Sequence, residues 1–180
     1  NLHLIAKAKG KKINQLNVMI LERDRHKPLV QEIRDAGART RMLMDGDVAG
    51  GIAAAREGTD VDALMGIGGT PEGIITACAI KTLGGVIQGR LWPTSDDEKQ
   101  KAIDAGHDLD RVMTTNDLVT SDNCYFAATG ITDGDLLRGV RYKKDRVLTQ
   151  SIVMRSKSGT IRVVDGEHQA HKWESYARSN

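Results

Sequence analysis

Residues 18–21 read Val-Met-Ile-Leu, a short run that contains no polar side chain. Two similar apolar runs follow at residues 42–44 and 63–67. A continuous apolar run is typical of a strand that is covered on both faces, whereas a half-exposed strand alternates. Between the first two runs, residues 27–36 place apolar side chains on one helical face, and Gly37 follows as a helix stop. Strand–helix–strand order at this spacing predicts right-handed βαβ units and a largely parallel sheet.

The same alternation extends outward from these runs to about residue 128. Further helices are expected at residues 48–56, 71–83 and 95–106, and further strands at residues 86–92 and 124–128. The last fifty residues differ, because β-rich stretches alternate there with short polar turns. These strands are expected at residues 140–142, 147–155 and 160–164.

We therefore expect an α/β fold in which helices flank a mostly parallel sheet with a C-terminal antiparallel addition. Residues 1–166 form one substrate-binding unit in this interpretation. The more polar residues 167–180, which include Trp173 and Tyr176, form a C-terminal tail.

The composition excludes several classes of function. The 180 residues carry a formal net charge of +2, so no basic surface for nucleic acid is expected. No apolar stretch approaches the roughly 20 residues that cross a bilayer, and the first residues lack the pattern of a signal peptide. Cys78 and Cys124 have no metal-ligand spacing and are expected to be reduced, buried thiols. These features predict a cytoplasmic protein that binds neither nucleic acid nor membranes.

The loop after the first predicted strand contains two arginines, Arg23 and Arg25. In open α/β sheets ligands bind beyond the carboxyl ends of the strands, and this loop lies at such an end. Two guanidinium groups can hold one phosphate through forked, charge-assisted hydrogen bonds. The plainer interpretation is that both are solvated surface arginines. His26, at the end of the loop, is interpreted as a cap or packing residue.

The loop after the second predicted strand is Asp45-Gly46-Asp47. Carboxylates at a strand end, beside a glycine that allows close approach, suit sugar hydroxyls or a divalent cation. A simpler explanation is that Asp45 ends the strand and Asp47 caps the next helix. The same tripeptide recurs at residues 133–135, which we interpret as a capped turn.

The third loop, at residues 66–73, reads GIGGTPEG. Its glycines allow backbone N–H groups to approach a ligand, and the helix that begins near Pro71 directs its positive end into the same space. Glu72 interacts favourably with this helix dipole and is also a hard oxygen ligand for Mg²⁺ or Mn²⁺. The spacing fits neither a P-loop nor a Rossmann fingerprint. Together the three loops indicate a phosphorylated, hydroxyl-rich substrate and a divalent metal.

With these loops in hand, the chain resembles the class II, GlpX-type fructose-1,6-bisphosphatases along nearly its whole length. The resemblance is strongest at residues 18–26, 45–50, 66–79, 129–142 and 151–160. It implies a fold related to the inositol-phosphatase-like sugar phosphatases, in enzymes that form dimers or tetramers. It also implies metal-assisted hydrolysis of the 1-phosphate of fructose 1,6-bisphosphate, which yields fructose 6-phosphate in gluconeogenesis.

The resemblance further implies roles for individual residues. Those expected to contact the substrate are Arg23, Asp24, Arg25, Asp45, Gly46, Asp47 and Gly69. The arginines would hold the phosphate that is not cleaved, the Asp-Gly-Asp loop would bind the sugar hydroxyls, and Gly69 would contribute a backbone contact. Glu72 would be one ligand of Mg²⁺ or Mn²⁺, and no catalytic residue is implied in this chain.

The chain departs from the family pattern in two ways. The arginine loop of the family usually reads Asp-Arg-Pro-Arg-His, whereas Glu22 and Asp24 replace the aspartate and the proline here, so the loop loses proline's fixed φ. The resemblance also covers only the C-terminal part of the family, without the N-terminal part that normally supplies the other metal carboxylates. Because a single carboxylate is a poor Mg²⁺ site, we expect little or no phosphatase activity from this chain alone. It would act with the missing segment or with a companion chain.

Three other functions stay open on the sequence. The substrate range could include sedoheptulose 1,7-bisphosphate, as in relatives from photosynthetic bacteria. The chain could instead be a non-catalytic phosphosugar-binding α/β domain, whose phosphate affinity would depend on neither Mg²⁺ nor Glu72. A nucleotide-binding Rossmann module is disfavoured because the glycine spacing is absent.

Overall fold

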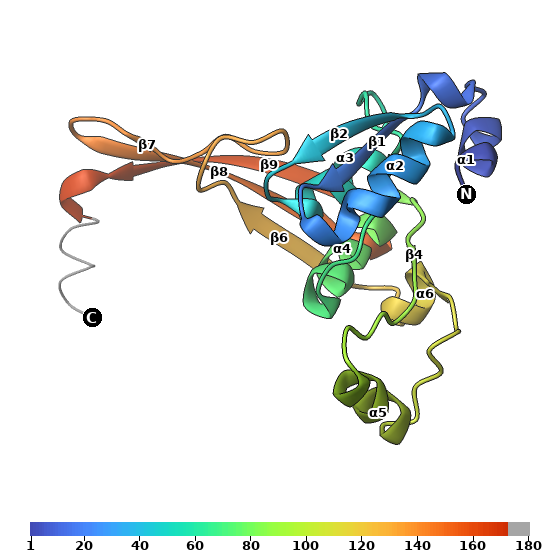
Figure 1. Ribbon diagram of the computed structural model, residues 1–180. Coiled ribbons are helices and arrows are strands. Elements are labelled where there is room, and N and C mark those ends of the chain that lie inside the picture. The colour runs from blue at the N-terminus through green and yellow to red at the C-terminus, as the bar shows by residue number, and fades with distance from the viewer. Residues whose placement is uncertain (173–180) are drawn as a thin grey trace.

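The structure is a computed structural model in which residues 1–172 are described. Three parallel strands lie in the order β2-β1-β3, with β1 (Asn17–Leu21) in the centre (Figure 1). β2 (Arg39–Leu43) pairs with all of β1, and β3 (Ala63–Leu64) pairs with two of its residues. α2 (Lys27–Asp35) connects β1 to β2, and α3 (Asp47–Ala55) connects β2 to β3. The predicted strand–helix–strand order is therefore confirmed for these elements.

The central strand β1 is buried because helices cover the sheet on both sides. Val18 and Ile20 lie in a core shared with α2 and with the N-terminal helix α1 (Leu2–Ala8). On the other face α3 comes so close that a Cβ added at Gly50 would lie 3.3 Å from Met19 Sδ. This double cover explains why the strand has no polar side chain between residues 18 and 21.

The second strand is less covered than its sequence predicts. β2 lies at the edge of the three-stranded sheet, so it has a strand neighbour on one side only. Met42 is 39% exposed and Met44, just beyond the strand, is 82% exposed. The expectation that residues 42–44 are buried on both faces is therefore wrong.

Two predicted strands do not join the parallel sheet. Within residues 86–92 only β4 (Gln88–Gly89) is a strand, and it pairs antiparallel with β5 (Met113–Thr114). β6 (Tyr125–Thr129) forms close to its predicted position but pairs antiparallel with β8 (Arg146–Arg155). Exposed and covered residues alternate along β6, as expected for a strand with one face toward solvent. The mostly parallel sheet of the prediction is corrected to three parallel strands, beside a larger antiparallel sheet.

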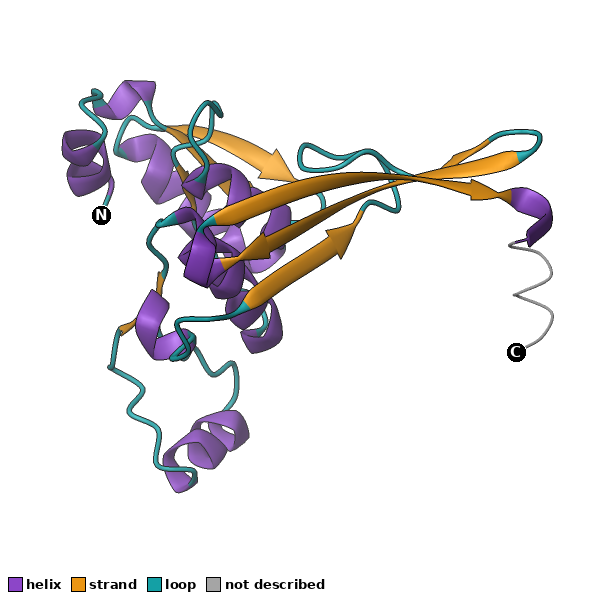
Figure 2. Cartoon of the chain, turned by 180° about the vertical axis from the view of Figure 1, so that it is seen from behind, coloured by secondary structure: helices purple, strands orange, loops and turns teal. Residues whose placement is uncertain are grey.

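The antiparallel sheet is built around β8. β6 and β7 (Arg141–Tyr142) pair with one edge of β8, and β9 (Thr160–Gln169) pairs with the other along its whole length. The β8–β9 ribbon projects from the helical body as an arm (Figure 2). Because β9 continues to Gln169, the predicted boundary after residue 166 falls inside a strand. Trp173 and Tyr176 lie outside the described residues.

α4 (Thr70–Leu83), the helix predicted at residues 71–83, lies between the two sheets, and Ala77, Ala79 and Ile80 are buried there. With α3 it supports one face of the antiparallel sheet through a second core. The fully buried members of this core are Ile52, Ala79, Ile152 and Met154. The predicted helix after residue 95 is α5 (Asp96–Asp104), where Ser95 Oγ accepts a hydrogen bond from Glu98 N at 3.2 Å. The remaining short helices are η1 (Ile13–Gln15), η2 (Asp24–His26), α6 (Thr115–Leu118) and η3 (Ser156–Ser158).

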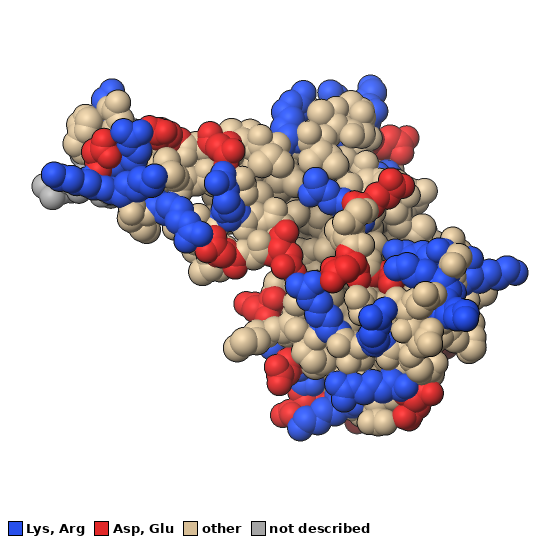
Figure 3. All heavy atoms as spheres, turned by 90° about the horizontal axis from the view of Figure 1, so that it is seen from above, with Lys and Arg blue, Asp and Glu red and all other residues tan. Residues whose placement is uncertain are grey.

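The surface of the described part is of mixed charge. Figure 3 shows positive and negative side chains interspersed along the arm. They form ion pairs there between Arg138 and Asp165 and between Arg141 and Asp133. Within residues 1–172, no helix has both the length and the apolar character that a membrane span requires.

The two cysteines are free thiols, as predicted, and they are half-buried. Cys124 Sγ lies 3.8 Å from the backbone oxygen of Cys78, which joins α4 to the start of β6. Burial, together with the neighbouring thiol of Cys124, raises the pKa of Cys78.

Candidate functional site

The carboxyl ends of β1, β2 and β3 bring three loops to one edge of the parallel sheet. These are the arginine loop (residues 22–26), the Asp-Gly-Asp loop (residues 45–47) and the glycine loop (residues 66–69). The strands are parallel and in register, so loops that are distant in sequence meet at this edge. Glu22 N donates to Leu43 O at 2.7 Å and extends the pairing into the loops.

The two arginines of the arginine loop reach in different directions. Arg23 Nη1 donates to the backbone oxygen of Met44 at 2.8 Å, and its Nη2 lies 4.0 Å from Asp45 Oδ1. Arg25 Nε donates to the backbone oxygen of Ile67 at 2.9 Å. Arg23 therefore contacts the Asp-Gly-Asp loop and Arg25 the glycine loop, so one short segment joins all three.

Asp24, between the two arginines, faces away from them in its ion pairing. Its carboxylate is 2.7 Å from Lys27 Nζ, and both side chains are largely exposed. The hydrogen bond and the charge of Lys27 lower the pKa of Asp24. The negative charge of Asp24 is thus partly balanced by Lys27, the first residue of α2.

The Asp-Gly-Asp loop leaves its carboxylates available. Gly46 has φ +88° and is the N-cap residue of α3, so Asp47 is the first helical residue and not the cap that was predicted. Asp47 Oδ1 accepts from Val48 N at 3.0 Å, and Asp45 Oδ1 accepts from Gly46 N at 2.9 Å. Asp47 Oδ2 is directed toward the glycine loop, because a Cβ at Gly68 would lie 3.3 Å from it.

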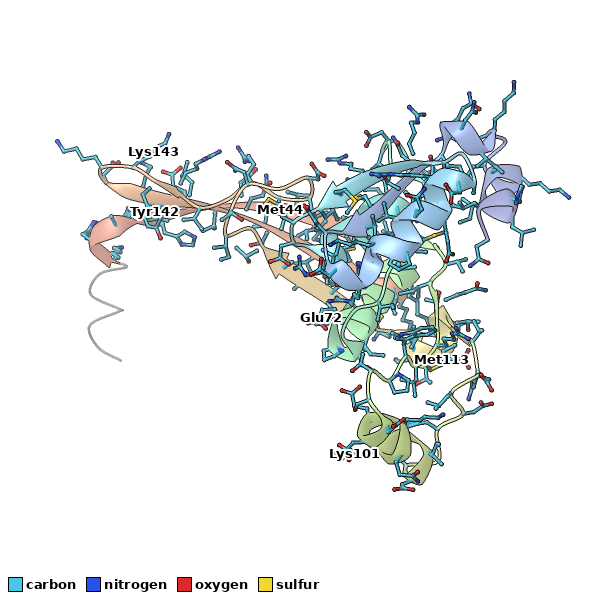
Figure 4. All side chains as sticks on the ribbon, in the orientation of Figure 1. Met44, Glu72, Lys101, Met113, Tyr142 and Lys143 are labelled. Atoms are coloured by element: carbon cyan, nitrogen blue, oxygen red, sulfur yellow. The ribbon has the colours of Figure 1, made fainter. Side chains whose placement is uncertain are left out.

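Glu72 lies in the first turn of α4 (Figure 4), and its carboxylate is close to Gly69. A Cβ added at Gly69, the N-cap residue of α4, would lie only 2.2 Å from Glu72 Oε2. Only glycine therefore leaves room for the carboxylate in this position. Arg25, Asp47 and Glu72 each approach the glycine loop, through Ile67, Gly68 and Gly69 respectively.

A cavity of about 600 Å³ opens beside the glycine loop. Its lining includes Asp47, Glu72 and the loop glycines, together with Met113 and residues of β4 and α5. Met113 and Glu72 are both labelled in Figure 4. The lining also contains Arg90, whose guanidinium lies 4.8 Å from the ring centre of Trp92. No sequence pattern around Arg90 marks a binding loop, so only the folded structure places it beside this cavity.

The described residues do not make a complete metal site. Among residues 1–172 no group of three or more His, Cys, Asp or Glu side chains is arranged to hold a metal ion. Mg²⁺ prefers six oxygen ligands, and the protein usually supplies more than one carboxylate. Glu72 and Asp47 alone do not meet this requirement.

The second Asp-Gly-Asp tripeptide has a structural role, as expected. Asp133 accepts from Gly139 N at 2.9 Å and pairs with Arg141. Asp135 pairs with Arg41 of β2 at 2.6 Å. These bonds close the loop before β7 and attach it to the parallel sheet.

The chain is similar to known proteins along most of its length. The family model described as bacterial fructose-1,6-bisphosphatase, glpX-encoded, matches residues 1–168. Two similar curated proteins are both called D-fructose 1,6-bisphosphatase class 2/sedoheptulose 1,7-bisphosphatase. The one from Synechococcus sp. (strain JA-3-3Ab) is 39% identical over 181 residues, and the one from Trichodesmium erythraeum (strain IMS101) is 40% identical. Each alignment covers 93% of this chain and 52% of the relative, so the chain spans about half the length of the curated relatives it matches.

Proposed function

Because the chain belongs to the glpX-encoded bacterial fructose-1,6-bisphosphatase family, we propose that it forms the substrate-holding half of such an enzyme. The reaction is hydrolysis of the 1-phosphate of fructose 1,6-bisphosphate, which yields fructose 6-phosphate and phosphate, in gluconeogenesis. The observation that supports this most directly is the meeting of the arginine, Asp-Gly-Asp and glycine loops at one sheet edge. It brings cationic, hydroxyl-binding and amide groups within reach of one phosphorylated sugar.

In this proposal each of the three loops binds a different part of the substrate. Arg23 and Arg25 bind the phosphate that is retained, since both guanidinium groups lie at the same edge with N–H groups to spare. The exposed carboxylate of Asp45 and the half-buried carboxylate of Asp47 accept hydrogen bonds from sugar hydroxyls, with Gly46 and Asp24 beside them. Gly69 contributes its backbone at the start of α4, where the helix dipole favours an anion.

Glu72 contributes one oxygen ligand to Mg²⁺ or Mn²⁺ in the proposed enzyme. Such a cation neutralises phosphate charge and activates water when it is bound. Since the described residues do not complete its coordination, further carboxylates come from outside them, from another segment or a companion chain. The proposal extends to an inositol-phosphatase-like fold, a cytoplasmic location, and a dimer or tetramer for the assembled enzyme.

The test is phosphate release from fructose 1,6-bisphosphate by the complete enzyme and by purified residues 1–180, each with and without Mg²⁺ or Mn²⁺. We expect metal-dependent release from the complete enzyme and little or none from residues 1–180 alone. Brisk release by residues 1–180 would refute the division of the site. Phosphosugar binding without metal-dependent release by the complete enzyme would instead favour a non-catalytic binding domain.

A second substrate, sedoheptulose 1,7-bisphosphate, is favoured by the names of the cyanobacterial relatives. The exposed Asp-Gly-Asp loop contains no bulky side chain that would select one sugar length. Comparing kcat/KM for the two bisphosphates with the complete enzyme decides between one substrate and two.

A further inference from the structure

His26 is the most deeply buried polar residue near the candidate site. This residue, at the end of the arginine loop, is 1% exposed. Nδ1 lies 2.8 Å from the backbone oxygen of Leu21, and Nε2 lies 2.8 Å from the backbone nitrogen of Ile67. The imidazole therefore spans from the end of β1 to the glycine loop.

The hydrogen bonds define the protonation of the ring. The backbone N–H of Ile67 can only donate, so Nε2 must accept and carry no hydrogen. The backbone oxygen of Leu21 can only accept, so the hydrogen is on Nδ1. Nε2 also lies 3.1 Å from Ile67 O, which is a contact without a hydrogen bond in this tautomer. With both nitrogens engaged, the ring is neutral and has no free atom for proton transfer.

The backbone of Ile67 is held at two points. His26 Nε2 accepts from the N–H of Ile67. Arg25, the residue before His26, donates through Nε to the carbonyl oxygen of Ile67 at 2.9 Å. Gly66 allows this contact, because a Cβ there would lie 3.1 Å from His26 Cε1 and its φ of +155° is rarely adopted by other residues. Neighbouring side chains of the arginine loop thus hold the glycine loop through the N–H and the C=O of Ile67.

We infer that His26 is a positioning residue for the candidate site. Its neutral imidazole fixes the glycine loop against the arginine loop and so sets the distance between the Arg25 guanidinium and the start of α4, where Glu72 lies. Its effect on turnover rests on the proposed function. The tautomer of His26 and its hydrogen bond to Ile67 do not rest on the proposed function, since both can be measured without substrate.

Two substitutions separate anchoring from simple packing. In His26→Gln the amide oxygen reaches about as far as Nε2 and can still accept from Ile67 N–H. In His26→Asn the amide nitrogen can replace Nδ1 toward Leu21, but nothing reaches Ile67. Both variants lose the ring, so we expect similar decreases in Tm.

We expect His26→Asn to lower kcat/KM of the complete enzyme for fructose 1,6-bisphosphate by about 10- to 100-fold, the cost typical of losing a supporting group. His26→Gln should remain within several-fold of the wild type. Equal losses in the two variants, or no loss in either, would overturn the inference.

Two measurements need no turnover. ¹⁵N spectra of the histidine-labelled protein should show His26 with its hydrogen on Nδ1. The Ile67 amide should exchange slowly in the wild type and in His26→Gln, and quickly in His26→Asn. A hydrogen on Nε2, or equal exchange in all three proteins, contradicts the anchoring. If the wild type does not hydrolyse the bisphosphate, the proposed function fails, and these two measurements still decide the role of His26.

Discussion

The carboxylate of Glu72 lies close to Gly69, which is three positions earlier in the sequence. The carboxylate occupies the volume that a Cβ at position 69 would fill. A glutamate in the first turn of a helix needs no such partner to interact with the helix dipole. The close approach over Gly69 therefore adds a constraint that the glycine-rich sequence suggested only in general terms.

Gly69→Ala should displace Glu72 with little cost to the fold, because the clash is with the end of a flexible side chain. We expect the metal concentration for half-maximal activity of the complete enzyme to rise, turnover to fall by about 10-fold or more, and Tm to shift by only a few degrees. Metal titrations of activity and thermal unfolding measure the two effects. An unchanged metal requirement would show that the position of Glu72 does not matter.

Asp62 illustrates a buried charge whose role is structural. It lies at the start of β3, at the opposite edge of the sheet from the candidate site, and is 6% exposed. Lys11 Nζ and Asn17 N donate to its two oxygens at 2.6 and 2.9 Å, and Lys9 Nζ lies at 3.3 Å. Burial opposes ionisation, but these partners outweigh it and lower the pKa of Asp62.

Because this pKa is lower in the folded than in the unfolded protein, the ionised carboxylate stabilises the fold above its unfolded pKa of about 3.9. That contribution is lost as the pH falls through the folded pKa. We expect Asp62→Asn to destabilise the protein at pH 7 by about 1.5–3 kcal/mol, with the difference from the wild type shrinking below about pH 4.

Denaturant unfolding at several pH values tests this prediction. Asp60→Asn is a matched control, because Asp60 is exposed and pairs only loosely with Arg41 at 3.3 Å. A difference between Asp62→Asn and wild type that stays constant down to pH 3 would contradict the assignment.

At the scale of elements, the positions of the strands were predicted better than the strands with which they pair. Residues 18–21 and 124–128 both read as apolar, yet one is the centre of the parallel sheet and the other belongs to the antiparallel sheet. Strand formation depends on local pattern, whereas direction and neighbours depend on contacts between distant segments. The strand predicted at residues 86–92 was overestimated for the same reason, because only Gln88–Gly89 forms a strand there.

The loop between β6 and β7 is an element whose sequence hides its tight packing. A Cβ at Gly130 would lie 2.1 Å from the backbone oxygen of Arg138, whereas one at Gly134 would have its nearest neighbour at 4.0 Å. We expect Gly130→Ala to cost about 1–3 kcal/mol in stability and Gly134→Ala to cost far less. Thermal unfolding of the two variants checks this, and equal Tm values would contradict it.

At the scale of the whole molecule, two cores are joined through α3 and α4. One core lies between the parallel sheet and α1 and α2, and the other between α3, α4 and the antiparallel sheet. α4 begins at the candidate site with Glu72 and continues into the second core through Ala79. The candidate site is therefore connected to the second core through a single helix.

We therefore expect Glu72→Gln to impair hydrolysis of the substrate while substrate binding persists. In the complete enzyme we expect metal-dependent turnover to fall by at least the ~10- to 100-fold typical of losing a supporting group around a metal. Binding of fructose 1,6-bisphosphate in the absence of metal should persist, because the arginine loop is unchanged.

Phosphate release and calorimetric titration measure these two quantities. Asp97→Asn is the control, since Asp97 is exposed on α5 and pairs with Lys101. Equal loss of binding and turnover in Glu72→Gln would contradict the assigned role.

The sequence by itself determined the βαβ start, the ends of α2, the three loops and the family, because each depends on local pattern or on motifs in order. Only the tertiary structure decided which strands share a sheet, that β2 lies at an edge, and that His26 anchors Ile67 from 41 residues away. Such contacts depend on where distant segments meet, and periodicity carries information only about the faces of a single element.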